Sequence, residues 1–133
     1  MIEDIFRLPG AMRRDPAIDA WFARGYATRL IVQPWFDELR GCGADVRELL
    51  HDGRPTVCVD DAAFAYVDAF AAHANIGFFY GAVLEDPLGL LQGAGKRMRH
   101  AKLHWGRQPD APALRGLIAA AYRDIRLRLD NAA

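Results

Sequence analysis

The spacing of apolar side chains divides the chain into three parts. Over residues 15–42 the apolar positions recur every three to four residues, which is typical of amphipathic helices. Asp15 and Pro16 favour a helix start, because Asp caps free backbone N–H groups and Pro suits the first helical turn. Residues 1–14 show no clear period, and we expect a loosely docked lead-in there.

The middle part, residues about 45–105, alternates between apolar and polar positions, which indicates strands. Short turns separate the strands, and Asp52-Gly53 is typical of a two-residue hairpin turn. Neighbouring strands should therefore pair antiparallel as a meander. Within this part residues 81–97 are rich in glycine, and we expect a long loop with one helical turn at residues 88–91.

The last part, residues about 111–129, has the clearest helical pattern, with apolar side chains on one face and arginines on the other. Helices, four or five strands and a final helix predict an α+β fold. We expect one antiparallel sheet with the N-terminal and C-terminal helices packed on one face. The length of 133 residues suits a single domain spanning residues 1–133.

Composition excludes several classes of protein. Apolar residues make up 52% and charged residues 26%, which is typical of a folded domain and not of a disordered chain. The chain has no serine, so a serine triad is excluded, and Cys42 and Cys58 are too few for a disulfide scaffold. No apolar run reaches the roughly 18–20 residues that cross a bilayer, and residues 1–10 do not resemble a secretory leader. We expect a cytoplasmic, reduced protein with no membrane partner.

The charge is unevenly distributed although its sum is zero, with 17 basic and 17 acidic residues. Residues 37–86 hold ten acids and three bases, a net charge of −7, whereas residues 96–128 hold nine bases and two acids, a net charge of +7. The zero sum makes nucleic acid an unexpected partner. Opposite halves of two copies could attract each other, which makes a homodimer one hypothesis.

Three segments resemble a bacterial domain family of unknown function, the YdhG-like proteins. Residues 46–56 resemble the family's Glu…Gly-x-Pro strand and turn, and residues 74–82 resemble its central strand. The match is closest over residues 86–103, which are similar to the family's Gly-Thr-Gly-Lys loop followed by a basic strand. The resemblance implies an α/β sandwich with an antiparallel sheet.

The resemblance also implies a function, since some YdhG-like proteins are described as frataxin-like intracellular iron chaperones. It points to a non-enzymatic protein that binds iron. Two positions depart from the family pattern. Ala94 replaces a threonine whose hydroxyl could meet a phosphate or a metal-bound water, and His51-Asp52 stands where many members have an aromatic residue.

Acidic side chains near the end of the helical region and on the first strand suggest a site for iron. Hard cations favour carboxylate oxygens, and an imidazole can add a further ligand. The interleaved arginines Arg40, Arg47 and Arg54 offer the alternative of surface salt bridges. The candidate ligands are Asp45, Glu48, His51 and Asp52.

The loop Gly93-Ala94-Gly95-Lys96 and the strand after it suggest a second hypothesis, a binding module for an anionic small molecule or an acidic protein. Glycines expose backbone N–H groups, and basic side chains add charge. The loop is not a P-loop, because Leu90 and Arg97 stand where that motif has glycine and Ser or Thr. The alternative is a glycine-rich connection beside a solvated basic strand. The candidate anion-binding residues are Lys96, Arg97, Arg99, His100 and Lys102.

Overall fold

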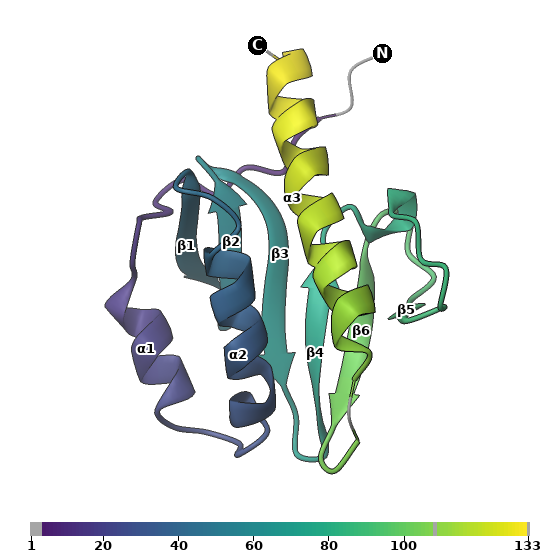
Figure 1. The fold of residues 1–133 in the computed structure, drawn as a ribbon. Helices are drawn as coiled ribbons and strands as arrows, with labels where there is room; N and C mark the ends of the chain where they lie inside the picture. The colour runs from purple at the N-terminus through teal and green to yellow at the C-terminus, as the bar shows by residue number, and fades with distance from the viewer. Residues whose placement is uncertain (1–3, 108, 133) are drawn as a thin grey trace.

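Across residues 4–107 and 109–132, which the computed structural model describes, six strands form one antiparallel sheet with helices over one face (Figure 1). The strand order is β1-β2-β3-β4-β6-β5. The strands are β1 (Val46–His51), β2 (Arg54–Val59), β3 (Ala62–Ala69), β4 (His73–Phe78), β5 (Leu91–Gln92) and β6 (Arg99–His104). The helices are α1 (Pro16–Phe22), α2 (Arg29–Arg40), α3 (Ala111–Ala132) and the 3-10 turn η1 (Gly81–Val83).

The predicted α+β fold is confirmed, and the sheet differs from the prediction at one end. Strands β1 to β4 form the expected meander, but β5 lies outside β6, so the strand order is not sequential there. The two residues of β5 belong to the segment that was predicted as a loop, because two residues are too few to show a period. The helical turn expected at residues 88–91 is wrong, and the turn of this segment is η1.

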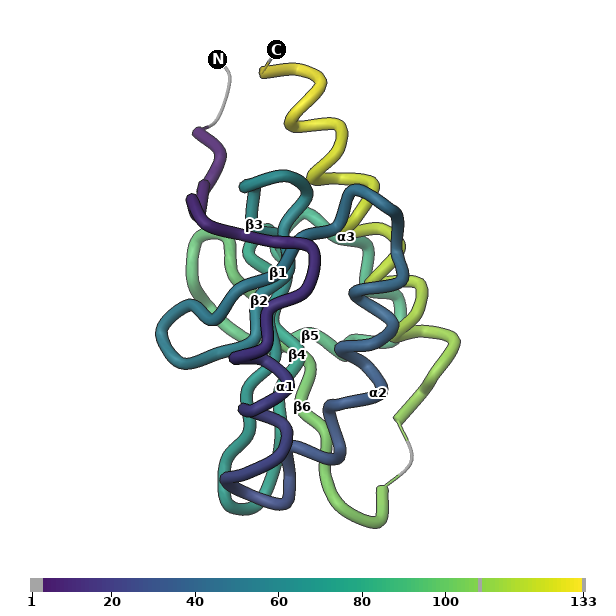
Figure 2. The backbone as a smooth tube through the Cα atoms, turned by 90° about the vertical axis from the view of Figure 1, so that its left-hand side faces the viewer, coloured from purple at the N-terminus to yellow at the C-terminus, as the bar shows by residue number. Residues whose placement is uncertain are grey.

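The two faces of the sheet differ in what covers them. Helices α2 and α3 pack on one face, as the edge-on view shows (Figure 2), and the large core side chains lie between them and the sheet. Successive side chains of a strand point to opposite faces, so those that alternate with the core residues point away from the helices. We call this side the open face, and its residues include Arg54, Tyr66, Asp68, His73, Asn75, His100, Lys102 and His104.

The N-terminal segment is tied to the sheet, so the expectation of a loosely docked lead-in is wrong for residues 4–14. Met12 and Glu48 exchange backbone hydrogen bonds of 2.9 and 2.7 Å, which pairs the segment with the outer edge of β1 (Figure 2). The Ala63 N–H donates to the Phe6 carbonyl at 3.0 Å. The segment covers an exposed sheet edge through its backbone, and backbone pairing leaves no side-chain period to detect.

The start of α1 agrees with the prediction. The Asp15 carboxylate accepts from the Ala17 N–H at 2.9 Å, and Pro16 is the first helical residue. The predicted C-terminal helix extends to Ala132.

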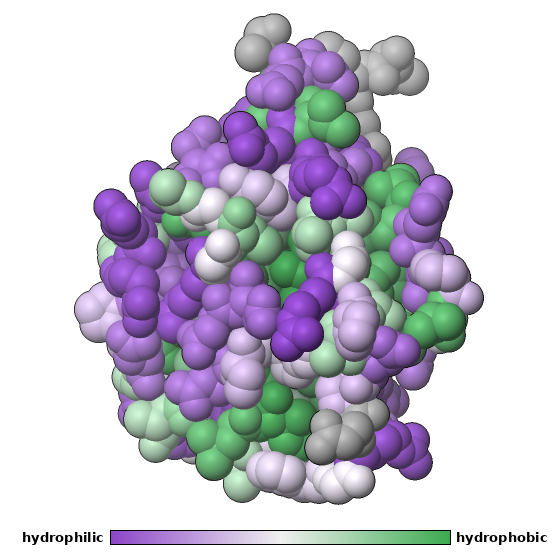
Figure 3. Space-filling view, in the orientation of Figure 1, coloured by the Kyte–Doolittle hydropathy of each residue, from purple (hydrophilic) through white to green (hydrophobic). Residues whose placement is uncertain are grey.

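Within the described residues no helix combines the length and the apolar character that a bilayer crossing requires. Hydrophilic side chains predominate on the helical side, with apolar patches between them (Figure 3).

Candidate functional site

Glu48, a predicted metal ligand, is buried and already bonded to the protein. Its side chain is 1% exposed. The Arg40 Nε and Nη2 atoms donate to its two oxygens at 2.7 and 2.9 Å, and the Asp15 N–H donates at 3.0 Å. Burial opposes the charge of Arg40, but the hydrogen bonds and charge of Glu48 outweigh it, so the pKa of Arg40 is raised. Glu48 thus joins β1, α2 and the start of α1.

The other predicted metal ligands lie elsewhere. Asp45 accepts from the Tyr122 hydroxyl at 2.6 Å and lies 3.6 Å from the Arg126 guanidinium. His51 and Asp52 face each other at 3.4 Å beside the β1–β2 turn. The described residues contain no group of three or more His, Cys, Asp or Glu side chains that could hold one metal ion. Iron binding therefore stays a prediction from the sequence.

Acidic residues of the segment 37–86 pair with basic residues of the segment 96–128 within one chain. Arg115 of α3 lies 3.2 Å from Glu38 of α2, and Arg126 of α3 pairs with Asp45. These pairs neutralise charge that the homodimer hypothesis would use between two copies.

The structure separates the predicted anion-binding residues. The Arg99 guanidinium donates to the carbonyls of Gly95 and Met98 at 2.6 and 2.7 Å, so it fastens the loop. Lys96 and Arg97 line a small cavity of about 90 Å³. His100 and Lys102 lie on the open face instead, because they alternate with the core residues of β6.

One of these residues, Arg97, also reaches a larger cavity of about 400 Å³. Small-molecule sites usually measure roughly 300–1,000 Å³, so this volume suits a small ligand. We call it the hairpin groove, since the β1–β2 turn forms one of its sides. Its lining residues are Phe6, His51, Asp52, Arg54, Phe79, Tyr80, Arg97 and Met98.

The β1–β2 turn places two polar side chains of the groove opposite each other. Asp52 and Gly53 have φ values of +51° and +73°. Two consecutive positive φ values are typical of the type I′ turn that joins strands through two residues. His51 and Arg54 are therefore direct register partners. The hairpin predicted from Asp52-Gly53 is confirmed.

Aromatic rings form the apolar part of the groove. The Phe6 ring lies 5.3 Å from the Phe79 ring and 5.6 Å from the His51 ring, measured between centroids. The Phe6 N–H donates to the Tyr80 hydroxyl at 2.8 Å, which holds the segment in place. The sequence did not indicate Phe6, because residues 1–14 show no period. The strand alternation could have found Phe79, which follows the core residue Phe78 and points to the other face.

The Arg54 side chain and the Arg97 backbone are held in place. The Arg54 Nε donates to Asp68 at 2.9 Å, and its guanidinium lies 5.3 Å from the centre of the Tyr66 ring. The Arg97 carbonyl accepts from the Ala82 N–H at 2.8 Å, which fixes this part of the loop beside η1. Two arginines and one carboxylate, Asp52, line the groove, and the Arg54 guanidinium is already paired with Asp68.

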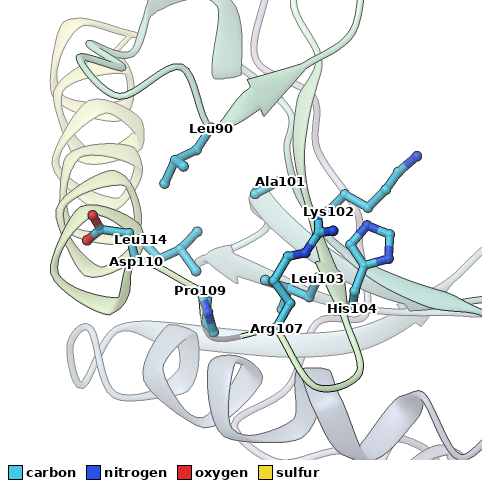
Figure 4. A pocket seen from close by; sticks show the side chains of 9 residues that line it. All are labelled: Leu90, Ala101, Lys102, Leu103, His104, Arg107, Pro109, Asp110 and Leu114. Carbon is cyan, nitrogen blue, oxygen red and sulfur yellow. The ribbon is translucent and has the colours of Figure 1, made fainter.

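A second cavity of about 190 Å³ lies between β6 and the start of α3 (Figure 4). Leu90, Leu103 and Leu114 line it, and Lys102 points away from them. The Asp110 carboxylate at its rim accepts from the Ala113 N–H at 3.0 Å, so it caps α3. The cavity is smaller than usual ligand sites and is largely apolar.

Histidines gather on the open face at the far end of β4 and β6. His73 and His104 are register partners with ring centroids 6.0 Å apart, and His73 stacks on Phe70 at 4.8 Å. Burial lowers the pKa of His73, and the charges of Lys102, His104 and His100 lower it further. Burial and Lys102 also lower the pKa of His100. The Asp68 carboxylate raises the pKa of His73 by a smaller amount, so burial and the cationic neighbours outweigh it.

Neither thiol is placed for nucleophilic chemistry. Cys58 is fully buried, and its pKa is raised by burial and by the charge of Asp61 to about 12. Burial, followed by the charges of Glu38 and Asp45, raises the pKa of Cys42 to about 11. The thiolate is the reactive form, so both side chains are inert at neutral pH.

Comparison of the chain with protein-family models, with curated proteins and with solved structures found no match. The resemblance to YdhG-like proteins stays a prediction from the sequence motifs.

Proposed function

We propose that the chain is a binding module for a small monoanion with an apolar body, which the hairpin groove receives. The observation that carries this proposal is the combination of an aromatic wall with two arginines in a cavity of about 400 Å³. The proposal keeps the glycine-rich loop of the sequence hypothesis, through Arg97 and Met98. In the proposed site, the β1–β2 hairpin takes the place of the strand residues His100 and Lys102.

The guanidinium groups of the lining favour an anionic ligand. Arg54 and Arg97 can each offer paired N–H donors to a carboxylate, which arginine binds in a planar, two-bonded geometry. Asp52 at the same rim repels further negative charge. A single carboxylate therefore suits the groove better than a polyphosphate, whose several negative charges Asp52 would oppose.

The apolar lining favours a ligand with a flat or chain-like hydrocarbon part. Phe6, Phe79 and Met98 supply aromatic and thioether surface, and both kinds of side chain adapt to aromatic ligands. A ligand of about thirteen non-hydrogen atoms that gains roughly 0.4 kcal/mol per atom binds with about 5 kcal/mol. That free energy corresponds to a Kd of about 0.2 mM.

A binding role without a catalytic step agrees with the groups that the chain provides. The chain has no serine, and the pKa values of the two thiols, about 11 and about 12, keep both protonated. The groove therefore contributes charge, shape and apolar surface, and no side chain in it is a strong nucleophile at neutral pH.

The test is a titration of the full chain with 2-naphthoate, followed by calorimetry and by amide chemical shifts. We expect a Kd near 0.2 mM and shifts at the β1–β2 turn and at residues 93–98. The neutral isostere 2-naphthamide should bind at least tenfold more weakly. Arg97→Gln should weaken naphthoate about fivefold to thirtyfold, because one charged hydrogen-bonding contact is lost.

The matched control is Arg107→Gln, which removes an arginine from the second cavity and should leave the Kd within twofold. Octanoate should also bind, whereas adenosine monophosphate should bind more weakly than naphthoate. Three results would overturn the proposal: no binding of any monoanion at 5 mM, equal binding of the amide, or equal weakening by Arg107→Gln.

A further inference from the structure

Two of the four histidines of the chain meet across neighbouring strands, far from each other in sequence. His73 begins β4 and His104 ends β6, and the antiparallel pairing makes them direct register partners. Both side chains lie on the open face, with ring centroids 6.0 Å apart and ring planes inclined by 40°. This pair is not part of the hairpin groove.

We propose that His73 and His104 form a two-imidazole site for a borderline divalent transition-metal ion, and that Cu²⁺ binds it most tightly. Imidazole nitrogen suits copper, nickel and zinc, and the general order of affinity places Cu²⁺ above Ni²⁺ and Zn²⁺. The site differs from the iron site expected from the acidic residues in its ligands, in its place and in the metal that it prefers.

The distance between the rings suits one shared ion after a small movement. A metal–nitrogen bond of about 2.0–2.1 Å and a bond angle of about 90–109° place two imidazole centres roughly 4.5–5.2 Å apart. The observed 6.0 Å therefore has to shorten by about an ångström. His73 is held by its stacking on Phe70, at 4.8 Å and 26°, so rotation of the His104 side chain closes the distance.

The described neighbouring side chains add no further ligand to the two imidazoles, and one of them is positively charged. The described residues place no third His, Cys, Asp or Glu so as to hold the same ion, so water completes the coordination shell. Lys102 lies two positions before His104 on the same face, opposite Asn75, and its charge already lowers the pKa of His73. The lysine repels a bound cation, and its removal should strengthen binding.

The remaining histidines provide matched controls. His100 lies on the same strand and face as His104, but four residues along a strand separate them by roughly 13 Å. His51 lies at the β1–β2 turn, in the hairpin groove. Neither can share an ion with the proposed pair.

The test is calorimetric titration of the untagged full chain with Cu²⁺, Ni²⁺ and Zn²⁺ at pH 7.5 in a weakly coordinating buffer. We expect one Cu²⁺ site, with affinity falling from Cu²⁺ to Ni²⁺ and from Ni²⁺ to Zn²⁺. His73→Gln or His104→Gln should weaken Cu²⁺ binding at least tenfold. The double variant should bind Cu²⁺ no more weakly than either single variant. His100→Gln and His51→Gln should stay within twofold of the wild type.

Lys102→Gln gives a readout of opposite sign, since loss of one nearby positive charge should tighten Cu²⁺ binding about threefold to tenfold. Electron paramagnetic resonance of the copper-loaded chain should show coupling to two imidazole nitrogens. Unchanged melting temperatures verify that the variants are folded. The proposal is overturned if His73→Gln and His104→Gln keep the wild-type affinity, if His100→Gln weakens binding equally, or if Lys102→Gln loosens it.

Discussion

The buried pair of Arg40 and Glu48 allows a decisive test of whether Glu48 has a structural role. Glu48 is 1% and Arg40 is 14% exposed, and two hydrogen bonds of 2.7 and 2.9 Å join them. Arg40→Met keeps a long apolar side chain but removes the charge and its N–H donors. The Asp15 N–H then remains as the hydrogen bond that the structure gives the carboxylate. We expect a large loss of stability from this single change.

The magnitude follows from the cost of leaving a buried charge without its partner, which is about 3–5 kcal/mol. Domains of this size are usually stable by about 5–15 kcal/mol, so the loss is a large fraction of the total. At roughly 3–5 °C per kcal/mol for a chain of this length, the melting temperature should fall by about 10–25 °C. The double variant Arg40→Met with Glu48→Leu should recover most of this loss, because no buried charge remains.

The assay is urea unfolding followed by tryptophan fluorescence and circular dichroism, with a common slope fitted to all variants. The matched control is Arg115→Met, which breaks a pair with Glu38 of 3.2 Å whose side chains are 58% and 44% exposed. An exposed pair contributes about 0–1 kcal/mol, so this control should stay close to the wild type. If Arg40→Met costs no more than Arg115→Met, or if the double variant is no more stable than Arg40→Met, the structural role of Glu48 is refuted.

The two thiols should react slowly with iodoacetamide at pH 8. With a pKa of about 11, about one Cys42 thiol in a thousand is ionised, against about one in ten at the ordinary value of 9.0, and Cys58 is still less ionised. Mass spectrometry should show alkylation about 100-fold slower in the folded chain than in urea, and equal rates would contradict the burial argument. Gly77→Ala should destabilise the fold by about 1–3 kcal/mol, because a Cβ there would overlap the Tyr66 ring. Urea unfolding measures this change, and Gly77→Ala in a Tyr66→Ala background should cost clearly less; an equal cost in both backgrounds would exclude the overlap as the cause.

The elements that depend on residues close together in the sequence could be predicted from it. The Asp15 cap and the Asp52-Gly53 hairpin act over two or three residues, and the structure confirms both. The alternation in β3 and β4 and the helical stripe of α3 were also sufficient to locate these elements, although the first four residues of β3 are all buried. The two-residue strand β5 escaped detection, since its pairing with β6 depends on backbone contacts and not on a pattern.

The candidate site could be predicted only in part. Arg97 belongs to the loop that the sequence singled out, and it does line the hairpin groove. Phe6 could not be predicted, because backbone pairing of the lead-in with the sheet brings it there. Glu48 was expected to be available to a metal, but Arg40 of α2 reaches it from another element and encloses it.

The α+β order of elements and the antiparallel pairing of β1 to β4 could be predicted from the sequence. These features follow from hydrophobic period and turn chemistry, which act between residues close along the chain. Which polar side chains meet depends on the tertiary structure. Arg54 with Asp68, Arg115 with Glu38 and His73 with His104 are separated in sequence and are brought together by strand register and helix packing. A net charge of zero is compatible with many such pairings, and the folded chain selects among them.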